Sequence, residues 1–150
     1  CCAGILGCSQ KEKAPENSAT VYLKREKPVF GAADGVIAPV YMDISGQSQD
    51  PAQLLGKYLR GVPGEGFVSP FPKGLFLISF KLEGLTAKVI LSDGIAELTG
   101  MDLTVALTCL TQTVMSLTGC REVIISAATA LLDGEKFITL SQDSLFYTAY

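Results

Sequence analysis

The sequence contains no histidine and no tryptophan, and each absence restricts the chemistry that the chain can perform. Without histidine, the chain can build neither a Ser-His-Asp catalytic triad nor a His-liganded metal site. The lack of tryptophan removes a large aromatic side chain that often stacks on carbohydrates, although tyrosine and phenylalanine remain available. No Ser-x-x-Lys sequence occurs either, so no serine has a lysine placed to activate it.

Positive charge and long hydrophobic runs are also scarce. The chain carries 12 basic and 15 acidic residues, a formal net charge of −3, and its lysines and arginines form no basic stripe. A nucleic-acid partner is therefore not expected. No uninterrupted apolar run reaches the length of a bilayer-spanning helix. Because 48% of its 150 residues are hydrophobic, the chain is expected to fold as one domain around a sizeable core.

The 5 cysteines fall into two sets. Cys1, Cys2 and Cys8 lie in a small-residue, apolar lead, whereas Cys109 and Cys120 lie in or just after a predicted helix. The helical rise between the latter two is roughly 16 Å, which is beyond the reach of a disulfide. No Cys-x-x-Cys pair is present, so a zinc site has no support. Cys109 is interpreted as a small buried hydrophobic residue.

Two helices are predicted from apolar periodicity and from capping residues. The first covers 51–60, where Asp50 can cap, Pro51 suits the first turn and Gly61 suits the exit. The second covers 100–119, and its apolar residues at spacings of three and four form a stripe that is expected to face a sheet.

Strands are predicted in most of the remaining folded region. Their ranges are 20–25, 36–42, 75–82, 85–92, 121–127 and 135–140. Pro39 lacks a backbone donor and marks the second strand as either an edge strand or an irregular segment. The third and fourth strands form a hairpin at Glu83-Gly84. Because the third strand is apolar on both faces, it is expected to be central in its sheet.

The order of these elements predicts an α+β fold, built as a small mixed β-sheet with both helices packed on one face. The expected organisation is a lead at 1–8, a polar tether without apolar periodicity at 9–19, and one folded domain at 20–150. No internal repeat is evident in the chain.

Three patterns invite a catalytic or ligand-binding interpretation, and each has a simpler one. The segment 61–68 has glycines at the Walker A spacing, but phenylalanine and valine occupy the positions of the required lysine and Ser/Thr. Ser92-Asp93-Gly94 offers a hydroxyl beside a carboxylate, but with no base to activate the serine a strand-ending turn is favoured. The acidic residues are scattered and single out no catalytic pair or calcium loop. The chain is therefore not expected to be an enzyme or to bind a cofactor or metal.

From about Thr20 to its end, the chain resembles the GerM-type sporulation and spore-germination domain. The resemblance follows a series of short motifs: VYLK at 21–24, PAQLLGKYLRGVP at 51–63, GFVSPFPKG at 66–74, the hairpin at 75–95, and the helix and strand at 103–126. Each motif alone is weak, since glycine and proline mark loops in many folds, and it is their order and spacing that carry the resemblance.

The resemblance implies a fold and a role rather than a catalytic site. GerM-type domains are similar to ring-building motifs, small βα sandwiches found in multi-subunit rings of bacterial envelopes. The implied function is that of a non-catalytic assembly module in sporulation or spore germination, with other envelope or sporulation proteins, or further copies of the chain, as partners. A cell-wall-binding envelope lipoprotein unrelated to sporulation is the alternative, and a hydrolase with unidentified carboxylates is a third hypothesis.

Ile5–Cys8 is similar to a bacterial lipobox, in which an aliphatic, a variable and a small residue precede the lipidated cysteine. Residues 1–8 are therefore interpreted as the remaining part of a lipoprotein signal peptide, with Cys8 carrying the lipid. The polar segment 9–19 then clears the lipid headgroups. A free or buried Cys8 in a chance apolar stretch is the alternative. A lipidated Cys8 anchors the domain to the cell membrane on its extracytoplasmic face.

The segment GFVSPFPKG at 66–74, within a proline- and glycine-rich loop, is the candidate interaction loop. Its candidate contact residues are Phe67, Ser69, Phe71, Pro72 and Lys73. Large side chains on a loop often mark a contact surface. A loop that fills the core and is fixed by its prolines is the alternative interpretation of the same residues.

Overall fold

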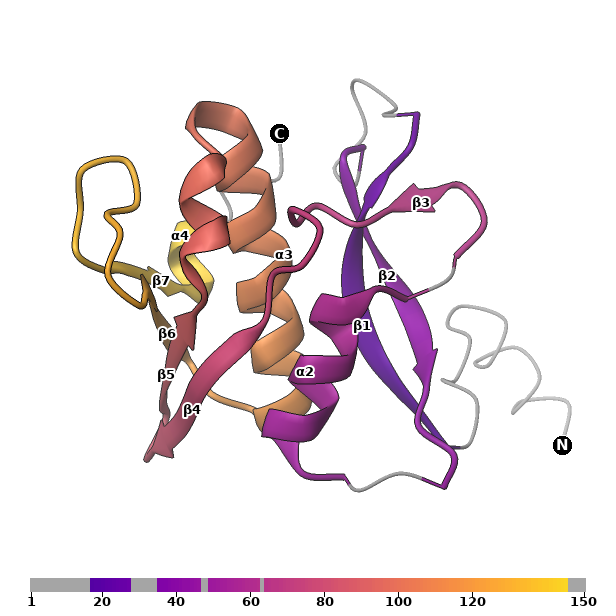
Figure 1. Cartoon of the computed structure of the whole chain (residues 1–150). Helices are drawn as coiled ribbons and strands as arrows, with labels where there is room; N and C mark the ends of the chain where they lie inside the picture. The colour runs from indigo at the N-terminus through magenta and orange to yellow at the C-terminus, as the bar shows by residue number, and fades with distance from the viewer. Residues whose placement is uncertain (1–16, 28–34, 47–48, 63, 146–150) are drawn as a thin grey trace, which may run out of the picture.

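The computed structural model describes residues 17–27, 35–46, 49–62 and 64–145. Two β-sheets lie on either side of two helices (Figure 1). The α+β class is confirmed, but the strands divide into two sheets with the helices between them, where a single sheet with both helices on one face was predicted. The expected signal segment at 1–8, with Cys8, and most of the expected tether at 9–19 lie outside the described residues.

The smaller sheet is antiparallel, with its strands in the order β2-β1-β3. These strands cover Ser18–Arg25 (β1), Ile37–Asp43 (β2) and Phe67–Val68 (β3). Pro39 lies in β2 opposite Tyr22, and β2 is an edge strand, which is one of the two placements predicted from the missing backbone donor. β3 was not predicted, because a strand of 2 residues shows no periodicity in the sequence.

The larger sheet is mixed, with its strands in the order β4-β5-β6-β7. These strands cover Leu77–Glu83 (β4), Thr86–Leu91 (β5), Glu122–Ala127 (β6) and Ile138–Ser141 (β7). β4 and β5 form the predicted antiparallel hairpin, and β7 is antiparallel to β6. β5 and β6 are parallel and are connected through the long helix α3, the kind of crossover that a parallel pair requires.

β4 lies at the edge of the larger sheet, so the prediction that it would be central is wrong. The register shifts between Leu77 and Ser79, which leaves Ile78 as an extra residue in β4. After this bulge the strand alternates regularly, with Phe80 and Leu82 on the inner face, opposite buried residues of β5. The bulge explains why apolar residues occupy both odd and even positions of the sequence although the strand is not buried on both faces.

Helix α2, Pro51–Arg60, begins and ends as predicted. The Asp50 side chain accepts a hydrogen bond from the Ala52 N–H at 3.4 Å, and Pro51 occupies the first turn. Gly61 follows the helix with a φ of 121°, where a residue with a side chain is strained. The buried face of α2 consists of Leu54, Leu55, Tyr58 and Leu59.

Helix α3, Gly100–Thr118, lies between the two sheets (Figure 1). Its predicted apolar stripe is buried at Leu103, Leu107, Leu110 and Val114 and half-buried at Leu117. Val105, Cys109 and Thr113 are buried as well, because another side of the helix packs against β1. Cys109 is a free buried thiol, as predicted. Burial on two sides explains why the helix separates two sheets rather than covering one.

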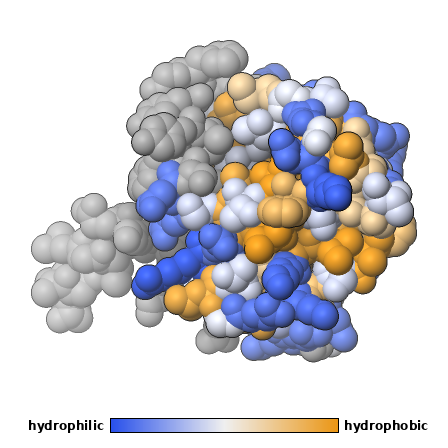
Figure 2. All heavy atoms as spheres, turned by 90° about the vertical axis from the view of Figure 1, so that its left-hand side faces the viewer, coloured by the Kyte–Doolittle hydropathy of each residue, from blue (hydrophilic) through white to orange (hydrophobic). Residues whose placement is uncertain are grey.

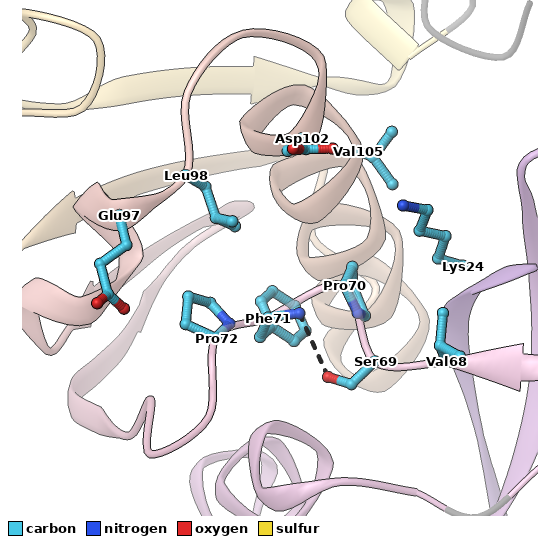
Figure 3. Close-up of a pocket in the computed structure, with 10 residues that line it drawn as sticks. All are labelled: Lys24, Val68, Ser69, Pro70, Phe71, Pro72, Glu97, Leu98, Asp102 and Val105. Atoms are coloured by element: carbon cyan, nitrogen blue, oxygen red, sulfur yellow. Dashed lines mark hydrogen bonds between the residues drawn. The ribbon is translucent and has the colours of Figure 1, made fainter. Parts of the chain in front are cut away.

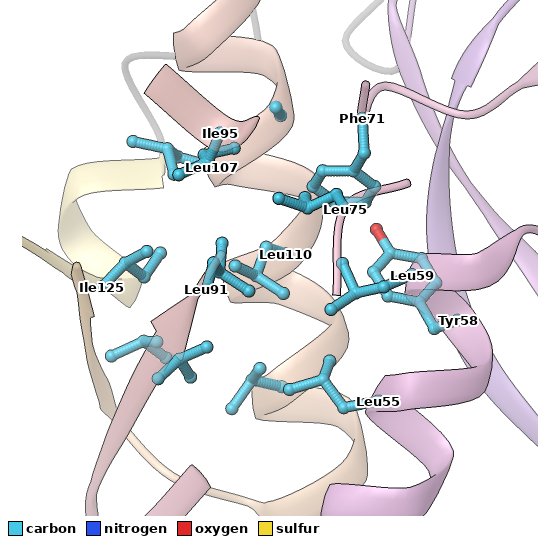
Figure 4. Packing of buried hydrophobic residues seen from close by; sticks show 14 of the residues in the cluster. Leu55, Tyr58, Leu59, Phe71, Leu75, Leu91, Ile95, Leu107, Leu110 and Ile125 are labelled. Atoms are coloured by element: carbon cyan, nitrogen blue, oxygen red, sulfur yellow. The ribbon is translucent and has the colours of Figure 1, made fainter. Parts of the chain in front are cut away.

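One apolar core joins both sheets, both helices and the segment before β4, and Figure 4 shows part of it. In this view Leu91 of β5 lies between Ile125 of β6 and Leu110 of α3, and Leu107 of α3 lies beside Ile95. Two short helices complete the described chain: the 3-10 helix η1, Asp93–Glu97, and α4, Gln142–Leu145. η1 contributes Ile95, which is fully buried.

Candidate interaction site

The segment 69–76 carries most of the predicted interaction loop from β3 in the smaller sheet to β4 in the larger one. Phe71 points into the protein and is only 8% exposed. Its ring meets the ring of Tyr58 edge to face, with centroids 5.4 Å apart and an interplanar angle of 83°. Phe71 therefore anchors the segment to the core. This agrees with the alternative interpretation of the loop, in which its large side chains fill the core.

The other candidate contact residues lie nearer the surface. The Ser69 hydroxyl accepts a hydrogen bond from the Phe71 N–H at 3.3 Å, and Ser69 itself is exposed. Pro72 is half-buried and Lys73 is exposed. Phe67 is half-buried, with the Arg25 guanidinium 5.6 Å from its ring centroid. Ser69 and Lys73 are thus the members of the set that a partner can reach directly.

A cleft of about 320 Å³ opens beside this segment (Figure 3). Its lining residues are Lys24, Val68, Ser69, Pro70, Phe71, Pro72, Glu97, Leu98, Asp102 and Val105. Ser69, Phe71 and Pro72 of the predicted set lie in this lining, whereas Phe67 and Lys73 do not. The cleft is at the small end of the range for ligand pockets.

The charged side chains of the cleft come from three separate elements. Lys24 belongs to β1, Glu97 to η1 and Asp102 to the first turn of α3. No ion pair joins these three side chains in the described part of the chain. In the sequence they are scattered single charges, and only the fold brings them together.

Ser92 and Asp93 have structural roles, which confirms the strand-ending turn favoured from the sequence. The buried Ser92 hydroxyl accepts a hydrogen bond from the Phe76 N–H at 3.1 Å. The Asp93 carboxylate accepts hydrogen bonds from the Thr129 hydroxyl at 2.5 Å, the Thr129 N–H at 2.8 Å and the Ala130 N–H at 2.9 Å. The hydroxyl bond is the largest of the effects that lower the pKa of Asp93, and the two amide bonds follow.

Two buried groups, Tyr58 and Cys109, are held in their protonated forms. Burial raises the pKa of Tyr58 well above its usual value of 10.0, and the nearby Cys109 raises it further. Burial also raises the pKa of the Cys109 thiol from 9.0 to about 12. A thiol with such a pKa carries almost no thiolate at neutral pH, so Cys109 is not an activated nucleophile.

Among the described residues there is no group of three or more cysteine, aspartate and glutamate side chains placed to hold a metal ion. Within the same ranges, no helix is both long enough and apolar enough to cross a membrane.

Hydrophobic side chains gather on the outer face of the larger sheet, across the middle of the view in Figure 2. The register places Ile90 and Ile124 on this outer face, since their neighbours Val89 and Ile125 are buried on the inner face. The exposed large hydrophobic residues of the larger sheet and its loops are Phe76, Ile78, Leu82, Leu85, Leu131 and Phe137. Four of these lie within or beside β4, which makes the β4 edge a second candidate contact surface.

No protein-family model matches the chain, and no curated protein matches it in sequence. Its structure, in contrast, matches solved GerMN domains. The first GerMN domain of the sporulation protein GerM from Bacillus subtilis is similar with a TM-score of 0.64 and 16% identity, over 84% of this chain and 98% of that domain. The tandem GerMN domains of the same protein are similar with a TM-score of 0.59 and 14% identity, over 79% of this chain and 40% of that one.

The chain therefore has the fold of a GerMN domain, as the order of its sequence motifs predicted. The match covers nearly the whole of that solved domain. At this level of identity the likeness establishes the fold, and it transfers no individual residue role.

Proposed function

We propose that the chain is a non-catalytic assembly domain of the bacterial envelope that acts in sporulation or spore germination. The observation that carries this proposal is the match to the first GerMN domain of a sporulation protein, over 98% of that domain. The domain works by binding other envelope or sporulation proteins. Its contact surfaces are the cleft beside 69–72 and the edge of β4.

The side chains of the described region support binding rather than catalysis. Ser92 and Asp93 are engaged in hydrogen bonds that hold the backbone, and Cys109 is buried as a neutral thiol. Exposed hydrophobic residues gather instead on one sheet and its edge, which is the arrangement typical of a protein contact surface.

The proposal includes a lipid anchor at Cys8 on the extracytoplasmic face of the cell membrane. Its support is the Ile5–Cys8 pattern and the polar segment 9–19 that follows it. Labelling cells with a clickable fatty acid tests the anchor directly. The full chain should carry the label and partition with membranes, and a Cys8→Ala variant should lose both properties. A labelled Cys8→Ala chain would show that the lipid lies elsewhere.

A chromosomal fluorescent fusion, followed through growth and starvation in the source organism, tests the role itself. The expected result is appearance only in sporulating cells, at the membrane that surrounds the forespore. Uniform signal around the vegetative envelope overturns the sporulation role. In a separate pull-down, binding of the purified chain to isolated cell wall identifies a cell-wall-binding lipoprotein instead.

A further inference from the structure

The sheet edges of this protein differ in how well they are protected against pairing with another strand. In β2, Pro39 interrupts the outer edge, and β3 has only 2 residues. β7 has 4 residues and runs directly into α4. β4 has 7 residues and contains no proline. Within the described ranges β4 is therefore the edge best suited to accept a further strand.

The hydrogen-bond pattern shows which β4 residues face the free edge. The Glu122 N–H donates to the Leu85 carbonyl, so the odd-numbered residues of β5 direct their backbone groups toward β6. The even-numbered residues of β5 therefore bond to β4, through its residues Ser79, Lys81 and Glu83. The remaining residues of the regular stretch, Phe80 and Leu82, direct their N–H and C=O groups outward.

The charges on the outer face of β4 are incompletely matched within the chain. Lys81 lies directly opposite Lys88 of β5, a like-charge pair. Glu83 reaches across to Lys88, with the Lys88 Nζ 3.0 Å from its carboxylate. Lys81 has no ion pair of its own among the described residues.

We propose that β4 pairs in antiparallel fashion with β4 of a second copy of this chain, with the two-fold axis passing at Leu82. This inference rests on the proposed assembly role and names the partner at the β4 edge. In this register the Leu82 residues of the two copies face each other as a hydrogen-bonded pair, which uses the outward backbone groups of Leu82. The larger sheets of the two copies then join into one continuous sheet.

The register is selected by charge. Pairing at Leu82 places Lys81 of each copy directly opposite Glu83 of the other, in the non-hydrogen-bonded positions where side chains are closest. Each Lys81 thereby gains the carboxylate that its own chain does not supply. A register with its axis at Phe80 instead sets Lys81 opposite Ser79 and runs into the bulge at Ile78. The contact is isologous and closes at two copies.

Cysteine cross-linking of the full chain tests the pairing and its register, in a background with Cys1, Cys2 and Cys8 replaced by serine. Opposite residues of a hydrogen-bonded antiparallel pair have Cα atoms about 5.5 Å apart, within disulfide range. Leu82→Cys should therefore form a disulfide-linked dimer under mild oxidation. Leu85→Cys is the matched control, because the exposed fraction of Leu85 is 54% and that of Leu82 is 45%. In this register, however, the Leu85 residues of the two chains are roughly 20 Å apart, so they should not form a disulfide.

Charge reversal provides a second test that separates pairing from folding. Lys81→Glu sets a carboxylate opposite Glu83 of the second copy, and we expect the dissociation constant of the dimer to rise about tenfold or more. The same substitution sets a carboxylate opposite Lys88 within the chain, so the thermal midpoint of the monomer should not fall. Combining it with Glu83→Lys should restore the dimer, as measured by sedimentation equilibrium.

The outcomes distinguish this inference from the assembly role. A strictly monomeric chain, or Leu82→Cys cross-linking no faster than Leu85→Cys, overturns pairing at β4. If the fusion still appears at the forespore membrane, the assembly role stands without it. If the fusion is uniform in vegetative cells while Leu82→Cys cross-links efficiently, the dimer stands and the sporulation role does not.

Discussion

The backbone N–H of Tyr22 donates a hydrogen bond to the side-chain hydroxyl of Thr113, at 2.9 Å, between residues that lie 91 positions apart in the sequence. The Tyr58 hydroxyl donates to the carbonyl of the same Tyr22, at 2.7 Å. Tyr22 lies opposite Pro39, whose nitrogen has no hydrogen to give, so the backbone of Tyr22 faces away from β2. The backbone N–H and C=O of Tyr22, on the edge of β1 that β3 does not cover, are thus hydrogen-bonded by one side chain from α3 and one from α2.

Replacing Thr113 with valine should destabilise the fold because it leaves the partly buried Tyr22 N–H without an acceptor. We expect a loss of about 1–3 kcal/mol in the free energy of unfolding, measured by urea titration. Thr111 is the matched control on the same helix, since it is equally buried and its hydroxyl has no hydrogen-bond partner among the described residues. Thr111→Val should be neutral or stabilising. Equal losses for the two variants would contradict the role assigned to Thr113.

Stability should fall at alkaline pH because two buried groups hold their protons in the folded state. The pKa of Tyr58 is raised above 10.0 by burial, and that of Cys109 is raised from 9.0 to about 12. The unfolded chain loses these protons at the lower values and therefore binds fewer of them, so unfolding becomes easier as pH rises. Urea midpoints measured between about pH 8 and about pH 11 should fall steadily.

Cys109→Ala removes one of the two titrating groups and should flatten this pH dependence. Cys120→Ala serves as the comparison for loss of a buried thiol as such, since Cys120 is also free and buried. A slope that is the same in both variants and in the original chain would show that the alkaline loss arises elsewhere.

Asp93 should keep the loop around Thr129 in place down to acidic pH. Its carboxylate accepts hydrogen bonds from Thr129 and Ala130, which lower its pKa below 3.8. A carboxylate with a depressed pKa contributes stability above its unfolded value, and that contribution is lost only as pH falls through the folded value. The amide resonances of Thr129 and Ala130 should therefore titrate together with a midpoint below 3.8.

Asp93→Ala should accelerate hydrogen exchange at the Thr129 and Ala130 amides and leave the core strands protected. Asp93→Asn is the milder variant, because its amide oxygen can still accept the hydrogen bonds from the Thr129 and Ala130 amides. A midpoint at or above the usual value for aspartate would mean that the three hydrogen bonds do not persist in solution.

Much of the local structure follows from patterns that a few neighbouring residues determine. The cap at Asp50, the exit at Gly61 and the hairpin turn after Glu83 each depend on backbone preferences within a few positions. The edge position of β2 is one of the two placements that Pro39 allows. Such features were predictable because the physical cause lies in the same stretch of sequence as the effect.

The division into two sheets and the charged cleft depend on contacts between distant segments. Because of the bulge at Ile78, the sequence of β4 is apolar at consecutive positions, as in a central strand. No neighbouring residue indicates that β4 lies at an edge. Lys24, Glu97 and Asp102 meet only after β1, η1 and α3 have packed. For the candidate loop, the sequence left two interpretations open, because a phenylalanine between prolines suits a contact surface and a core anchor equally well.

Substitutions at Phe71 and Lys73 separate these two interpretations. Phe71 is buried against Tyr58, so Phe71→Ala should cost about 3–5 kcal/mol of unfolding free energy. Lys73 is exposed in the same segment, and Lys73→Ala should change stability by less than about 0.5 kcal/mol. Urea titration of both variants gives these values.

Cross-linking to partner proteins in sporulating cells then supplies the second measurement. Loss of cross-links in the stable Lys73→Ala variant assigns partner binding to the exposed part of the segment. If that variant keeps every cross-link while Phe71→Ala loses them only in proportion to its unfolded fraction, the segment is a structural connection between the two sheets. The partner contact then lies elsewhere, and the edge of β4 is the next surface to change.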